Sequence, residues 1–111
     1  MFSDTAEYFE PEIYSESRRG ENAMERKRAV VTGGSSGIGR GIVYCLAEAD
    51  YDVAFSYCSR EASAQAVCSA LKLRYPDGRF FCFQADLSEP GVGPHFFRQA
   101  ANALGGVDLM V

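Results

Sequence analysis

Short apolar runs alternate with longer stretches of helical periodicity along most of this chain. The first three runs end in glycine or a polar cluster, which is typical of buried strands. Between the runs, apolar residues recur at the i, i+3, i+4 spacing of an amphipathic helix. The runs predict strands at 28–32, 51–57, 79–85 and 107–111.

The same spacing predicts which face of each intervening helix is buried. The first apolar face comprises Ile38, Ile42, Cys45, Leu46 and Ala49. The second comprises Ala62, Ala66, Val67, Ala70, Leu71 and Leu73. The third comprises Val92, Phe96, Phe97, Ala100, Ala103 and Leu104, and we expect Ser88 to cap this helix.

Strands that alternate with helices at this spacing predict the α/β fold class. Parallel strands joined by helical crossovers form a sheet covered on both faces. We therefore expect a doubly wound parallel sheet with strand order 3-2-1-4, incomplete because the fourth strand ends with the chain. An edge left unpaired at that strand predicts that the isolated chain aggregates or dimerises there.

The first 25 residues differ in composition from the rest. Residues 1–25 hold seven acids and two bases, whereas the remainder holds eight acids and nine bases. We predict an acidic, disordered extension at 1–25 and one domain at 26–111. Met24 is an alternative start, because the first strand follows it almost at once.

Charge and cysteine spacing narrow the possible functions. No basic stripe indicates a nucleic-acid partner, and no apolar stretch is long enough to span a membrane. Cys45, Cys58, Cys68 and Cys82 form no CxxC pair, and His95 is the only histidine, so no metal site is expected. We interpret the cysteines as small buried residues of a protein in the reducing cytoplasm.

A glycine-rich stretch stands between the first predicted strand and the first helix. Its spacing is Gly33-x-x-x-Gly37-x-Gly39. Glycines there permit a tight turn, close approach of a ligand and close helix packing, and the helix N-terminus attracts an anion such as a pyrophosphate. Ser35 and Ser36 add hydroxyls that can reach phosphate or ribose. The alternative is a turn that only connects strand to helix.

The segment TGGSSGIG, Thr32 to Gly39, resembles the TGxxxGxG cofactor motif of the short-chain dehydrogenase/reductase family. ADLS at 85–88 and GGVDLMV at 105–111 resemble later segments of the same family. The resemblance implies a Rossmann-like fold truncated at its fourth strand. It also implies that a nicotinamide dinucleotide binds to Gly33, Ser35, Ser36, Gly37, Ile38 and Gly39.

The end of the second predicted strand indicates which dinucleotide is preferred. Tyr57 stands where NAD-preferring members of the family carry an aspartate, and Ser59 and Arg60 follow it. A guanidinium beside a hydroxyl suits the 2′-phosphate of NADP(H), so we favour NADP over NAD. Arg60 could instead be a solvated helix-start residue, and Ser36 lacks the basic side chain that many NADP-preferring members have.

The resemblance assigns Asp86 and Leu87 to the adenine of the cofactor, Asp86 through its carboxylate. The alternative for Asp86 is a helix cap or a turn residue.

The family's catalytic pair, Tyr-x-x-x-Lys, is absent from this chain, so we assign no catalytic residue. The first hypothesis is the N-terminal part of an NADP(H)-dependent oxidoreductase that acts on a carbonyl or alcohol, for example as a 3-oxoacyl reductase, and forms a homo-oligomer when complete. The alternative is a non-catalytic dinucleotide-binding regulatory module.

Overall fold

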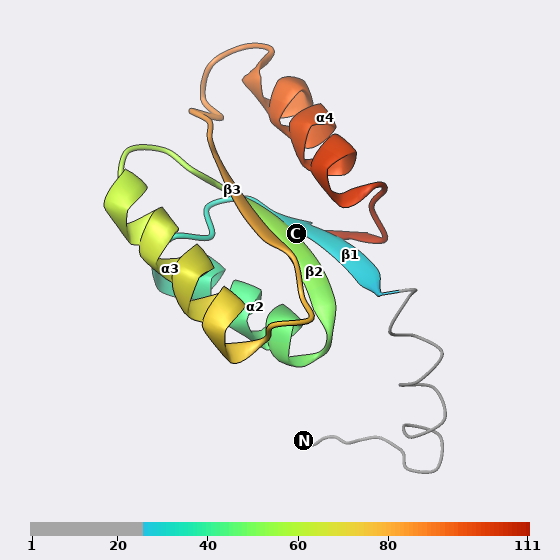
Figure 1. Cartoon of the computed structure of the whole chain (residues 1–111). Helices are drawn as coiled ribbons and strands as arrows, with labels where there is room; N and C mark the ends of the chain where they lie inside the picture. Colours follow the sequence, from blue (N-terminus) through green and yellow to red (C-terminus); the bar gives the residue numbers. More distant parts are fainter. Residues whose placement is uncertain (1–25) are drawn as a thin grey trace.

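The computed structural model describes residues 26–111, which alternate strands and helices throughout (Figure 1). The predicted extension at 1–25 lies outside the described residues. The elements are β1 (Lys27–Val31), α2 (Gly37–Glu48), β2 (Tyr51–Tyr57), α3 (Glu61–Arg74), β3 (Phe80–Gln84), α4 (Val92–Leu104) and β4 (Leu109–Met110).

The four strands form one parallel sheet in the order β3-β2-β1-β4, which confirms the predicted topology. β1 pairs with β2 along its whole length, from Lys27 to Val31. β2 pairs with β3, and the last pair is Tyr57 with Gln84. Because all the pairs are parallel, the carboxyl ends of β1, β2 and β3 lie together at one side of the sheet, at the ends of the strands and not on a face. The loops to α2, α3 and α4 leave from that side (Figure 1).

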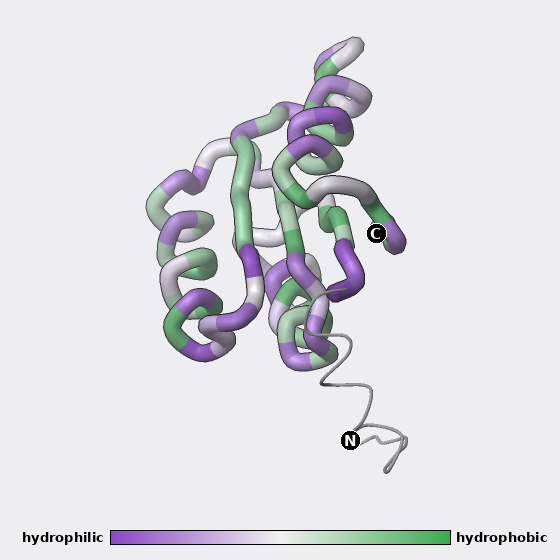
Figure 2. The backbone as a smooth tube through the Cα atoms, turned by 45° about the vertical axis from the view of Figure 1, so that its right-hand side comes forward, coloured by the Kyte–Doolittle hydropathy of each residue, from purple (hydrophilic) through white to green (hydrophobic). Residues whose placement is uncertain are grey.

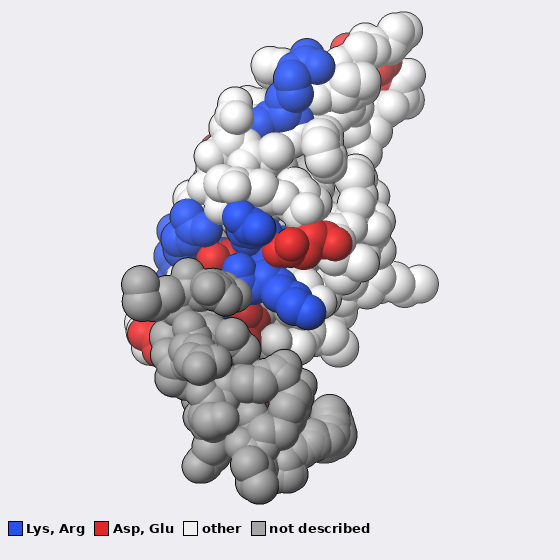
Figure 3. Space-filling view, turned by 90° about the vertical axis from the view of Figure 1, so that its right-hand side faces the viewer, with Lys and Arg blue, Asp and Glu red and all other residues white. Residues whose placement is uncertain are grey.

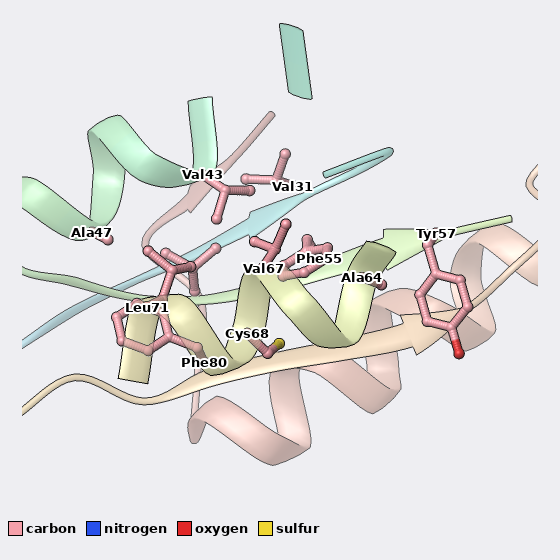
Figure 4. Close-up of a cluster of buried hydrophobic side chains, with 11 residues drawn as sticks. Val31, Val43, Ala47, Phe55, Tyr57, Ala64, Val67, Cys68, Leu71 and Phe80 are labelled. Atoms are coloured by element: carbon pink, nitrogen blue, oxygen red, sulfur yellow. The ribbon is translucent and has the colours of Figure 1, made fainter. Parts of the chain in front are cut away.

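Helices cover both faces of the sheet. α2 and α3 lie on one face and α4 on the other (Figure 1). The central strand β2 serves both: Val53 and Phe55 pack with α2 and α3, whereas Ala54 packs with α4. Hydrophobic strands are enclosed between helices that carry polar residues outward (Figure 2). The larger core lies on the α2 and α3 side (Figure 4).

The predicted buried face of α2 is wrong by a rotation about the helix axis. Ile38 is 84% exposed and Cys45 and Ala49 are exposed, while Val43 and Ala47 are fully buried. Close packing of Gly39 on the preceding turn sets this rotation, because residues four and eight positions further on face the same way.

The faces of the other two helices were predicted with different success. In α3 the buried residues are Ala64, Val67, Cys68 and Leu71, so Ala62, Ala66, Ala70 and Leu73 were wrongly assigned. Alanines on several sides of α3 make its periodicity ambiguous. In α4 large residues mark a single face, and Phe96, Ala100 and Leu104 are buried as predicted.

Two further predictions are corrected. Ser88 does not cap α4, because that helix begins at Val92 after Gly91, whose φ of 82° ends the preceding turn. Of the four free cysteines only Cys68 is buried, whereas Cys45 and Cys58 are exposed. Cys58 follows the last residue of β2 and therefore leaves the layered core.

Candidate dinucleotide site

The predicted site residues come from three segments that leave the sheet on the same side. The glycine-rich turn follows β1, residues 58–60 follow β2, and Asp86 and Leu87 follow β3. In parallel α/β sheets, ligands bind beyond the carboxyl ends of the strands, where such loops meet. The fold therefore brings the predicted segments to the edge at which a ligand is expected.

The glycine-rich turn needs its glycines for two separate reasons. Gly33 and Gly37 have φ values of +68° and +62°, a region that side-chain-bearing residues rarely adopt. A Cβ at Gly39 would overlap the carbonyl oxygen of Gly33, so the first turn of α2 packs directly on the preceding main chain. Around Gly33 and Gly37 the space is open.

The turn is tied to β2 by residues that the sequence analysis missed. Ser56 is 1% exposed; its hydroxyl oxygen accepts the Gly33 amide at 3.0 Å and its carbonyl accepts the Gly34 amide at 2.9 Å. A Cβ at Gly34 would stand 2.7 Å from Phe55, which explains a fourth glycine outside the motif spacing. Ser56 looks like any polar residue of a strand, so the sequence carries no signal for this role.

Beyond those two amides the turn leaves its donors open. Arg40 is the first residue of α2 whose amide reaches a backbone carbonyl, that of Ser36. Within residues 26–111, the amides from Ser35 to Gly39 donate no hydrogen bond. The first turn of α2 holds no acidic residue, and Ser36 makes no side-chain cap. The positive end of the helix dipole is uncompensated, so this end fits a diphosphate.

The side chains of the turn differ in exposure. Ser35 is buried, whereas Ser36 is exposed beside the open amides. Ile38, expected in the core, instead presents an apolar surface at the same end of α2. A ligand at this helix end therefore meets polar main chain and an exposed isoleucine together.

The segment after β2 carries the residues predicted to choose between the dinucleotides. Tyr57 packs its ring into the larger core, and its hydroxyl points out of the cluster (Figure 4). Ser59 and Arg60 are exposed, and Arg60 is the N-cap residue of α3. The Arg60 side chain has no hydrogen-bond or ion-pair partner within the described residues.

Burial raises the pKa of the Tyr57 hydroxyl, with smaller contributions from the Glu61 carboxylate and from Cys82. Glu61 therefore lies close enough to the end of β2 to act electrostatically there. Glu61 is the first residue of α3 and directly follows Arg60.

Asp86 adopts the turn role that the sequence analysis named as its alternative. Its Oδ1 accepts hydrogen bonds from the Ser88 amide at 3.1 Å and the Ser88 hydroxyl at 2.6 Å. These bonds hold the pKa of Asp86 below its ordinary value. Leu87 is 41% exposed between them. The other carboxylate oxygen of Asp86 has no hydrogen bond within residues 26–111.

The sequence analysis also considered His95, a metal site and a membrane span. His95 is exposed on α4. Within residues 26–111, no three His, Cys, Asp or Glu side chains gather where they could hold a metal ion. None of the helices in this part of the chain has the length and apolar character needed to cross a bilayer.

A parallel sheet in this order, with a glycine-rich turn between its first strand and first helix, defines a Rossmann-like α/β protein. The chain belongs to the short-chain dehydrogenase family, whose model matches residues 27–111. This finding confirms the resemblance stated from the sequence motifs.

Two curated relatives illustrate the similarity. A 3-oxoacyl-(acyl-carrier-protein) reductase of Staphylococcus aureus is 34% identical over 85 residues, covering 77% of this chain and 34% of the relative. An NADPH-dependent aldehyde reductase of Arabidopsis thaliana is 30% identical over 105 residues, covering 91% of this chain and 36% of the relative. The chain thus spans about a third of the length of these relatives.

Solved structures agree with the fold. A short-chain dehydrogenase from Burkholderia cenocepacia in complex with NADP matches with a TM-score of 0.71 and 38% identity, covering 76% of this chain and 34% of that one. A blue fluorescent protein from a metagenomic library, in complex with NADPH, matches with the same TM-score and identity over the same shares.

Proposed function

We propose that this chain binds NADP(H) at the carboxyl edge of its sheet, as the cofactor-binding part of a short-chain oxidoreductase. The observation that carries the proposal is the uncompensated N-terminus of α2. Its open amides stand beside a turn in which Gly33 and Gly37 have positive φ and Gly39 has no room for a Cβ. Gly33, Ser35, Ser36, Gly37, Ile38 and Gly39 would hold the diphosphate bridge and the groups next to it.

The preference for NADP over NAD rests on Arg60. Its guanidinium is exposed, unpartnered within the described residues, and placed at the N-terminus of α3. A cation at the positive end of a helix is unfavourable on its own, and an anion bound there would relieve the repulsion. Asp86 and Leu87 would contact the adenine, with the unengaged carboxylate oxygen of Asp86 accepting its amino group.

The proposed activity of the whole protein is reversible hydride transfer to a carbonyl or from an alcohol. The nicotinamide supplies the hydride chemistry when it is bound, and these residues only bind and orient it. We propose that the catalytic groups lie outside these 111 residues and that the complete protein is a cytoplasmic homo-oligomer. A substrate of the 3-oxoacyl or aldehyde type is supported by the names of the two curated relatives.

Calorimetric titration of the chain with NADPH and NADH tests the binding. We expect an NADPH Kd between about 1 µM and 1 mM, the range in which typical enzyme KM values fall. Gly39→Ala should weaken binding about tenfold or more, because relieving its overlap with the Gly33 carbonyl displaces the turn. Gly41→Ala is the matched control, since Gly41 lies in the same helix with open space around it. Failure to bind either dinucleotide would refute the proposal.

A further inference from the structure

The segment Cys58–Arg60 joins β2 to α3 and carries the residues proposed to recognise the 2′-phosphate. All three of its side chains are exposed. None of them makes a hydrogen bond or ion pair within the described part of the chain. The position of the Arg60 guanidinium therefore depends on how the main chain of this segment is held.

Two hydrogen bonds hold the main chain of this segment, and another holds the Tyr57 carbonyl directly before it. The carbonyl of Tyr57 accepts the amide of Ala85 at 2.9 Å, and the carbonyl of Arg60 accepts the amide of Ala64 at 3.0 Å. Between them, the carbonyl of Cys58 accepts Nε2 of Gln84 at 2.9 Å. The first two bonds are main-chain bonds that most sequences could make, whereas the third depends on one side chain.

Gln84 is placed to make this bond by the sheet itself. It is the last residue of β3 and pairs in register with Tyr57, the last residue of β2. Its side chain is exposed, so packing does not explain its choice. Its side-chain amide adds one hydrogen bond between β3 and the segment that follows β2, directly before Ser59 and Arg60.

We propose that Gln84 is a positioning residue for NADP recognition. Its side-chain amide holds the Cys58 carbonyl and so fixes the direction in which Arg60 leaves the sheet toward the 2′-phosphate. The inference rests on the proposed function and deepens it, because it assigns cofactor preference to a residue on a different strand. An arginine on a loosened segment would keep its charge but lose its preset position, which lowers affinity.

The test replaces Gln84 by methionine, which keeps the length of the side chain and removes the donor. Gln65→Met on the exposed side of α3 is the matched control. Calorimetry measures the Kd of NADPH, of NADH and of adenosine 2′,5′-bisphosphate. Because one hydrogen bond is lost, we expect Gln84→Met to weaken the two 2′-phosphate ligands about three- to tenfold. Binding of NADH by Gln84→Met, and of all three ligands by Gln65→Met, should be unchanged.

A double-mutant cycle separates positioning from general stability. In an Arg60→Ala background, Gln84→Met should have no further effect on NADPH binding, because no guanidinium remains to be placed. Equal weakening of NADPH and NADH, an additive double mutant, or an unchanged affinity ratio would each overturn the inference while leaving the proposed function standing. An unmodified chain that binds no dinucleotide would instead refute the proposed function.

Discussion

The polar groups at the two ends of the parallel strands differ in how they are satisfied. We call the end at which β1, β2 and β3 begin the amino edge, and the end at which they finish the carboxyl edge. At the amino edge, Asp52 is 3% exposed, and its carboxylate accepts Nε of Arg26 at 2.7 Å and both the amide and the side chain of Arg79. Arg28 pairs with Asp108 beside them, and positive and negative side chains lie together on this surface (Figure 3). At the carboxyl edge, amides and a guanidinium have no partners within the described residues.

The amino edge therefore contributes to stability, whereas the carboxyl edge is suited to binding. The charged side chains at the amino edge pair with one another, and Arg79 also donates to the carbonyl of Leu104 at 2.8 Å, which connects the end of α4 to the sheet. Groups satisfied in this way have little left for a ligand. The carboxyl edge leaves hydrogen-bond donors without partners among the described residues. This lowers stability and creates a site for an anion.

The largest expected effect is the loss of the amino-edge cluster in Asp52→Ala. Removing the buried carboxylate takes the shortest partner from Arg26, whose side chain is only 14% exposed and keeps the Tyr51 carbonyl at 3.2 Å and the Asp50 carboxylate at 4.0 Å. It also frees the Arg79 amide at the start of β3. We expect unfolding free energy to fall by about 3 kcal/mol, as for other buried pairs that lose one partner. Urea denaturation followed by circular dichroism measures it.

Asp77→Ala is the control for this change, because Asp77 is exposed in the turn before β3 and should matter little. An Asp52→Ala protein as stable as the unmodified chain would show that the amino edge does not support the fold. Dinucleotide affinity of the folded fraction should stay the same, since the cluster lies at the opposite edge.

The next effect is on ligand choice. Arg60→Ala should weaken NADPH about tenfold to a hundredfold, the value of a charge-assisted hydrogen-bonded contact, and leave NADH unchanged. Arg98→Ala on the exposed side of α4 is the control. Titration of both ligands decides the matter, and equal affinity of the unmodified chain for NADPH and NADH would remove the role of Arg60.

A smaller change is expected from Glu61→Gln. The Glu61 carboxylate acts on the end of β2, where it contributes to the raised pKa of Tyr57. A carboxylate near a bound 2′-phosphate repels it, so its neutralisation should strengthen NADPH binding about twofold at low salt. NADH binding should not respond, and Glu48→Gln is the control. A gain that persists at high salt would contradict the electrostatic explanation.

The same contrast shows what sequence could and could not predict. The strands and the glycine-rich turn are local patterns, so their positions followed from spacing. The strand order followed from the rules for parallel α/β sheets. Asp52 looks like a misplaced polar residue in a strand, because its partners Arg26 and Arg79 lie 26 and 27 positions away. The bond between Gln84 and Cys58 also spans 26 positions. Such pairs depend on strand register, which single-sequence periodicity does not specify.

The smallest effect concerns the turn after β3. The Asp86 carboxylate there contributes to stability and is also proposed to contact the adenine. Ser88 lowers the pKa of Asp86 below its ordinary value of 3.8 by two hydrogen bonds to the charged form. A depressed pKa in the folded state stabilises the fold above the unfolded-state pKa, and this contribution disappears as pH falls through the folded-state pKa.

Ser88→Ala removes the hydroxyl donor, so we expect the pKa of Asp86 to rise toward its ordinary value. Stability should drop slightly near neutral pH, and the difference from the unmodified chain should disappear once the pH falls below the folded-state pKa of Asp86, where Asp86 is protonated in both states. An NMR titration of the Asp86 carboxyl carbon follows the pKa, with Ser69→Ala on α3 as the control. If the stability difference persisted unchanged at low pH, Ser88 would act through packing and not through the charge of Asp86.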